Sequence, residues 1–222
     1  MILLARTMAL GVLAALAVGC QNPINLRNAQ SYYDAGLTAS GRGDYFQAAA
    51  LYSRSISNAE IGRAPAAGKA MAYYGYGRTL CLLGEFEEGV EALETSLELQ
   101  REVEPESVPE LLRRTSVLGR IHLDTGDHAA AVPYFREANE LVSTPGAGRI
   151  APGDRLSLLR DYRVAAEAGA DDDERARIDE EIALIVSEHG ESPRAYDYER
   201  FTPEAVAERR AADMSPEEFR RK

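Results

Sequence analysis

The chain has 222 residues, with 36 acidic and 25 basic side chains, which give a formal net charge of −11. Its length is ample for a buried hydrophobic core. The acidic balance argues against nucleic acid or an anionic membrane surface as the main ligand.

Residues 1–19 differ in composition from the rest of the chain. They carry one charged side chain, Arg6, followed by an apolar run from Met8 to Gly19. This run is shorter than the roughly 20 apolar residues that a bilayer-spanning helix needs. A charged start, a short apolar core and small residues before a cleavage site are typical of a secretory signal. We therefore expect residues 1–19 to be a signal peptide.

The residues around Cys20 read LAVGCQ over positions 16–21. This resembles a bacterial lipobox, although Ala17 stands where that family usually has leucine. The resemblance implies cleavage before Cys20, a lipid on its thiol and a short tether over residues 20–25. By the family's sorting rules, Gln21 favours the outer membrane over the inner, with the protein facing the periplasm. An ordinary cleaved signal and an uncleaved anchor are the alternatives.

Cys81 is the second of two cysteines. If Cys20 carries lipid, Cys81 has no intramolecular partner, so the chain is not a disulfide framework. We expect Cys81 to be a small buried apolar residue and not a catalytic or redox group.

Three segments share one spacing, in which a first glycine is followed by similar residues 7, 9, 12, 16 and 19 positions later. The copies start 41 and 42 residues apart. Their members are Gly36, Gly43, Tyr45, Ala48, Tyr52 and Ser55; Gly77, Gly84, Phe86, Gly89, Leu93 and Ser96; and Gly119, Gly126, His128, Ala131, Phe135 and Ala138. Such a pattern predicts repeated helical hairpins.

Each position in the pattern has a physical role. The first glycine lets two antiparallel helices approach closely, and the second ends the first helix in a left-handed cap. The residues at 12, 16 and 19 lie on one face of the second helix. One hairpin cannot bury that face alone, so neighbouring hairpins must stack.

The three copies resemble tetratricopeptide repeats, most closely at residues 126–135, which include Pro133 early in the second helix. The copies depart from that family in having Tyr32, Tyr73 and Thr115 where tryptophan is typical, and in their longer period. The resemblance covers residues 26–142. It implies an all-α, right-handed solenoid and a scaffold for protein–protein interaction that catalyses nothing.

Residues 143–190 are expected to form a degenerate fourth hairpin or cap. Asp154 can cap a first helix, and Ile178, Ile182 and Ile185 give the stripe of an amphipathic second helix. Residues 191–222 have no continuous apolar face. We expect this charged tail to be partly helical or disordered and only loosely attached.

By the same resemblance, the first helices of the hairpins line a concave groove in which partner peptides lie. One residue beyond each buried glycine, a helix has turned by about 100°, so a second set of stripes faces elsewhere, toward the groove. The stripes are Gln30, Tyr33 and Leu37; Met71, Tyr74 and Arg78; and Arg113, Ser116 and Arg120.

From these stripes we predict a partner-binding groove formed by Tyr33, Leu37, Tyr74, Arg78, Arg113, Ser116 and Arg120. Its arginines would bind an acidic segment or a C-terminal carboxylate, and its tyrosines would pack beside that segment. Alternatively, the arginines are solvated or pair with neighbouring glutamates such as Glu110. The two-repeat carboxylate clamp known in the family is not reproduced here.

No nucleotide-binding, zinc-protease or hydrolase motif occurs in the chain. We expect no catalysis, cofactor or metal. His122, Asp124, Asp127 and His128 cluster near one turn, but both histidines occupy repeat positions that are normally aromatic, so we expect them to be packing residues. The function we predict is a scaffold in the bacterial cell envelope. The alternatives are an accessory subunit or regulator of a periplasmic cell-wall enzyme, and a small-molecule-binding module.

Overall fold

The computed structural model describes residues 21–148, 150–191, 193 and 198–213. The expected signal peptide and the expected lipidation site, Cys20, lie outside these residues. The described part contains nine α-helices and a short 3-10 turn at Pro145–Ala147. The helices are α2 (Pro23–Gly41), α3 (Tyr45–Ile61), α4 (Ala66–Leu82), α5 (Phe86–Val103), α6 (Val108–Asp124), α7 (His128–Val142), α8 (Pro152–Gly169), α9 (Asp172–His189) and α10 (Pro203–Asp213).

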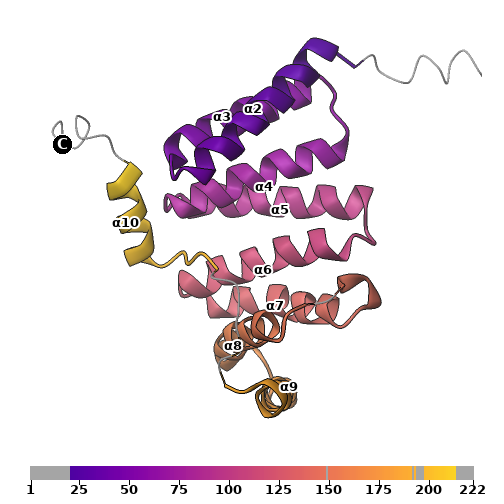
Figure 1. Ribbon diagram of the computed structural model, residues 1–222, viewed down its shortest axis with the longest axis vertical. Helices are drawn as coiled ribbons and strands as arrows, with labels where there is room; N and C mark the ends of the chain where they lie inside the picture. The colour runs from indigo at the N-terminus through magenta and orange to yellow at the C-terminus, as the bar shows by residue number, and fades with distance from the viewer. Residues whose placement is uncertain (1–20, 149, 192, 194–197, 214–222) are drawn as a thin grey trace, which may run out of the picture.

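The helices α2 to α9 form four consecutive hairpins that stack into one array (Figure 1). The hairpins pair α2 with α3, α4 with α5, α6 with α7, and α8 with α9. This confirms the predicted all-α array of tetratricopeptide-like hairpins. The first helix of the fourth hairpin starts at Pro152, so Asp154 lies in its first turn and does not cap it. No helix in the described residues is long and apolar enough to cross a membrane.

The turns within the first three hairpins depend on glycine. Gly43, Gly84 and Gly126 have φ angles of 84°, 83° and 85°, a region that side chains with a Cβ rarely adopt. Each turn reverses the chain between a first and a second helix. The predicted role of the second glycine in each repeat is therefore confirmed.

The backbones of α4 and α5 approach each other closely at Gly77 and Gly89. A Cβ atom on Gly77 would lie 2.6 Å from the carbonyl oxygen of Gly89 and 2.9 Å from the backbone nitrogen of Leu93. In the first and third hairpins, the corresponding glycines pack instead against the rings of Tyr52 and Phe135. Glycine at the first repeat position thus makes room for the backbone of the second helix in one hairpin and for an aromatic ring in the other two.

Three clusters of buried apolar residues lie along the described part of the array, and each of them contains one member of the same repeat position. Tyr52, Leu93 and Phe135, which occupy the same repeat position, are all buried. Cys81 is fully buried beside them, and burial raises the pKa of its thiol to about 12. A reactive thiolate is therefore disfavoured, in agreement with the predicted packing role.

Residues 198–213, which we call the C-terminal strap, fold back along the array. Phe201 is 2% exposed, Val206 of α10 packs on Gly84, and the backbone N–H of Phe46 donates to Asp213 Oδ2 over 2.7 Å. The strap thus runs from the third hairpin to the first, with α10 beside the array (Figure 1). The sequence predicts a partly helical and loosely attached tail; residues 203–213 are helical, and isolated side chains contact the array without forming an apolar stripe.

Candidate functional site

Five of the seven predicted groove residues line one pocket, which we call the central pocket. Its volume is about 700 Å³. The five residues are Tyr74, Arg78, Arg113, Ser116 and Arg120, from α4 and α6. Residues of α8 and of the loop before it form the far wall, and the strap residues Tyr198, Glu199 and Phe201 close one side. The first helices α4, α6 and α8 of three successive hairpins therefore share a hollow, whereas the predicted stripes lay on α2, α4 and α6.

The other two predicted groove residues lie elsewhere. Tyr33 lines a smaller pocket of about 240 Å³ with Gln30 and Met71, between the first and second hairpins. Leu37 is 48% exposed and lines neither of these two pockets. The predicted groove is therefore divided between the central pocket and a smaller one, and Leu37 lies in neither.

Each of the four arginines that line the central pocket has a carboxylate partner. The pairs are Arg78 with Glu199, Arg113 with Glu110 at 3.0 Å, Arg120 with Asp161 at 3.0 Å, and Arg155 with Glu181 at 2.9 Å. Only the Arg113 pair is the local helix pair that the alternative reading expected. The guanidinium groups of the other three meet acids from distant parts of the sequence.

Arg113 is the most accessible of these arginines, with 54% of its side chain exposed. An exposed pair spaced i, i+3 contributes only about 0.3–0.5 kcal/mol, so its partner Glu110 is easily exchanged for another carboxylate. Arg120 differs, because it is buried and its Nε–H donates to Asp161. Arg113 is thus the cation best placed to meet an incoming acid, whereas Arg120 is fixed in the wall.

The sequence analysis missed Arg114, which is 1% exposed. Its Nε–H donates to Ser96 Oγ over 2.9 Å, its Nη1–H donates to Glu110 Oε2 over 2.7 Å, and its guanidinium lies 5.3 Å from the ring centre of Tyr74. Arg114 therefore holds the carboxylate of Glu110 and the ring of Tyr74 in place at the edge of the central pocket. A signal was present, because position 114 shares a helix face with the apolar positions 111 and 118.

The strap residues contribute three contacts that the sequence did not reveal. Glu199 pairs with Arg78, the ring of Tyr198 lies 3.8 Å from the guanidinium carbon of Arg120, and Phe201 joins the buried cluster of α4 and α6. In addition, the N–H of Phe201 donates to Asp124 Oδ2 over 2.6 Å. Aromatic rings on arginine and charge-assisted pairs are the means by which proteins recognise aromatic and acidic groups.

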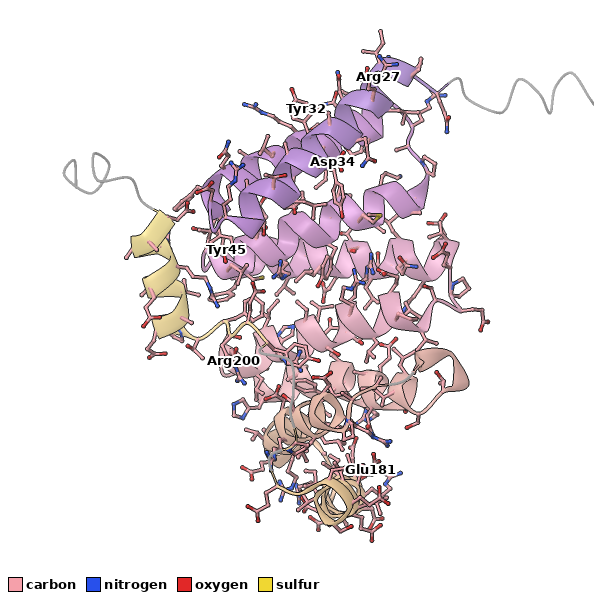
Figure 2. All side chains as sticks on the ribbon, viewed as in Figure 1. Arg27, Tyr32, Asp34, Tyr45, Glu181 and Arg200 are labelled. Carbon is pink, nitrogen blue, oxygen red and sulfur yellow. The ribbon has the colours of Figure 1, made fainter. Side chains whose placement is uncertain are left out.

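Arg200 points out of the pocket and ties the strap to the array. It pairs with Asp124 at the end of α6 and with Asp161 of α8, the latter at 3.3 Å. Figure 2 shows Arg200 near the end of the array from which the strap departs toward α10. Of residues 198–201, Tyr198, Glu199 and Phe201 thus line the central pocket, whereas Arg200 pairs with acids at its edge.

The electrostatics of the pocket favour charged arginine and neutral tyrosine. Burial lowers the pKa of Arg78, but the charge and hydrogen bond of Glu199 outweigh it, so the net shift is upward. Burial raises the pKa of Tyr74, against the effect of the nearby arginines. Among the described residues, no group of three or more His, Cys, Asp and Glu side chains has the arrangement of a metal site. The arginine and tyrosine side chains of the central pocket can therefore bind an acidic group that is flanked by aromatic groups.

Comparison with known proteins supports the repeat assignment. Residues 68–142 match the family model described as tetratricopeptide repeat. Among solved structures, the chain is similar to tetratricopeptide-like repeats from a candidate kinesin light chain of Podosopora anserina, with a TM-score of 0.57 and 16% identity over 80% of this chain and 82% of that one. No curated protein matches the chain by sequence. The matched residues include α4 to α7, which carry most of the central pocket.

Proposed function

We propose that this chain, whose residues 68–142 match the tetratricopeptide-repeat model, is a membrane-anchored scaffold of a bacterial cell envelope that binds a segment of a partner protein in the central pocket. Tetratricopeptide domains generally bind protein or peptide partners and are typically not catalytic. The observation that carries the proposal is the central pocket itself. It brings Tyr74, Arg78, Arg113 and Arg120 from successive first helices to one hollow.

The shape and charge of the central pocket suit a peptide. The array residues that line it come mainly from helices of three hairpins, so a bound segment would contact several repeats at once. Arginine forks and tyrosine rings supply directional contacts to carboxylate and aromatic groups. The volume also falls within the range of small-molecule pockets. A cell-wall fragment is therefore the second candidate ligand, and a thermal shift with such fragments but not with peptides would favour it.

The proposed binding site is tested by photocrosslinking in living cells. A photoreactive phenylalanine analogue is placed at position 113, which is exposed at the pocket, and a matched analogue at position 98, an exposed site on α5 that does not line the pocket. We expect one dominant adduct from position 113 and none from position 98, identified by mass spectrometry. Equal adducts from the two positions would mean that the central pocket is not the working surface.

The proposed anchor rests on the apolar run of residues 8–19 and on Cys20, which the lipobox-like sequence would expose as the first residue after cleavage. Two or more acyl chains make membrane attachment stable, since each buried methylene contributes about 0.8 kcal/mol. Expressed in a diderm bacterium with an alkyne fatty acid, the chain should carry the label and fractionate with membranes. Cys20→Ser should lose both properties. A label that persists in Cys20→Ser, or an unlabelled wild-type chain, would contradict the anchor.

A further inference from the structure

The start of the strap lies on the array as a bound peptide would. Residues 198–202 are not helical, and their side chains enter three separate subsites. Arg120 receives the ring of Tyr198, Arg78 receives the carboxylate of Glu199, and the apolar cluster of α4 and α6 receives Phe201. The backbone N–H of Phe201 is also bound, by Asp124. Such a combination of aromatic, acid and main-chain contacts is typical of peptide recognition.

The rest of the strap makes fewer contacts, among them the hydrogen bond from the Phe46 N–H to Asp213 Oδ2. Val206 is the only buried residue among those of α10. The ion pair of Arg210 with Glu85, at 3.4 Å, joins two half-exposed side chains, and such pairs contribute little to binding. Attachment therefore depends mainly on residues 198–201, so loss of these contacts would free the strap.

The strap is also connected to the array by a short stretch of chain. Helix α9 ends at His189, and eight residues, 190–197, separate it from Tyr198. A segment on a short tether has an effective concentration in the millimolar range. The strap can therefore occupy its subsites even when each contact is weak. A free peptide replaces it only if the peptide binds more tightly than the strap or is present above the strap's effective concentration.

We infer that residues 198–201 are an internal ligand of the central pocket, and that the partner presents a segment of the same chemistry: an aromatic residue, then glutamate, then a basic residue, then phenylalanine. This inference rests on the proposed function and names the class of its partner. The partner's glutamate takes the place of Glu199 on Arg78, and its two aromatic side chains take the places of Tyr198 and Phe201. The chain carries a net negative charge, but the partner's glutamate meets a local positive charge. When Glu199 leaves, the guanidinium group of Arg78 is without its acid and can pair with the partner's glutamate.

The inference is tested with a fluorescent peptide that has the sequence of residues 198–207, added to the purified full chain in mild detergent. The double variant Glu199→Gln/Phe201→Ala releases the internal ligand but keeps every receiving side chain. We expect it to bind the peptide roughly tenfold or more tightly than the unmodified chain, because the tethered competitor is weakened. If the double variant loses helicity, Glu199→Gln alone should give a smaller change in the same direction.

A charge exchange shows whether the peptide uses the same subsite. In the strap-released background, Arg78→Glu should weaken binding of this peptide at least tenfold and should bind a peptide with lysine in place of the glutamate. The lysine of the altered peptide and the glutamate at position 78 would restore the ion pair with its charges exchanged. A variant that had merely lost its structure would not bind the lysine peptide. Binding that is unaffected by Arg78→Glu, or that is equal in the released and unmodified chains, would overturn the inference.

The peptide-binding test and the crosslinking test at position 113 can succeed or fail independently of each other. A dominant partner crosslinked at position 113 whose capture is not competed by the peptide would leave the scaffold in place and refute the aromatic–acidic motif. Tight peptide binding without a partner at position 113 would support the motif as an internal contact and refute the scaffold proposal. Competition of the crosslinked partner by the peptide, but not by its lysine counterpart, would support both.

Discussion

Replacement of Phe135 by alanine should lower the free energy of unfolding by about 3–5 kcal/mol, the usual loss for a fully buried aromatic side chain. Phe135 is 0% exposed, covers Gly119 of α6, and lies with its ring centre 6.2 Å from that of Tyr162 in α8. Its ring therefore joins the third hairpin to the fourth. Because each hairpin in such an array is stabilised by its neighbours, we expect the fourth to become unstable first.

The measurement is denaturant unfolding followed by circular dichroism, together with limited proteolysis of the fourth hairpin. Phe46→Ala is the matched control, because the same side chain is 46% exposed in α3 and should cost less than about 1 kcal/mol. Comparable losses at the two positions would contradict the assigned core.

Replacement of Gly77 by alanine should cost about 1–3 kcal/mol, the range for overpacking in a closely packed interior. The new methyl group would meet the backbone of α5 at the Gly89 oxygen and the Leu93 nitrogen. Backbone atoms cannot move aside as a flexible side chain does, so the α4–α5 hairpin must open. The gain in helix propensity from glycine to alanine, about 0.5–1 kcal/mol, offsets only part of this cost.

Gly68→Ala is the matched control within the same helix. A Cβ atom at Gly68 meets nothing within 4 Å, so this change should stabilise the chain by about 0.5–1 kcal/mol through helix propensity alone. Thermal and denaturant unfolding of the two variants gives opposite signs if the account is right. A neutral or stabilising Gly77→Ala would mean that the hairpin is not closely packed there.

The hairpins could be predicted from the sequence because their signals are local and periodic. Glycine at positions 43, 84 and 126 fixes each turn through its own backbone freedom. The buried position shared by Tyr52, Leu93 and Phe135 follows from helix periodicity. The same periodicity placed five groove residues correctly around the central pocket.

What the sequence did not reveal depends on tertiary contacts between distant residues. Glu199 lies 121 positions from Arg78 in the sequence. Residues 198–201 are not helical, so no periodic pattern indicates which part of the array they contact. Likewise, Asp161 reaches Arg120 only because α8 packs beside α6. The local pair of Arg113 with Glu110, by contrast, is spaced i, i+3 and could be anticipated.

In the proposed mode of action, the first helices form a binding surface which the strap occupies in the absence of a partner. The most direct test is the crosslinking yield from position 113 in cells, compared between the unmodified chain and Glu199→Gln. We expect one dominant partner from position 113, a higher yield of that adduct in Glu199→Gln, and no such adduct from position 98 in either chain. A yield that is unchanged by Glu199→Gln, or equal at positions 113 and 98, would contradict the account.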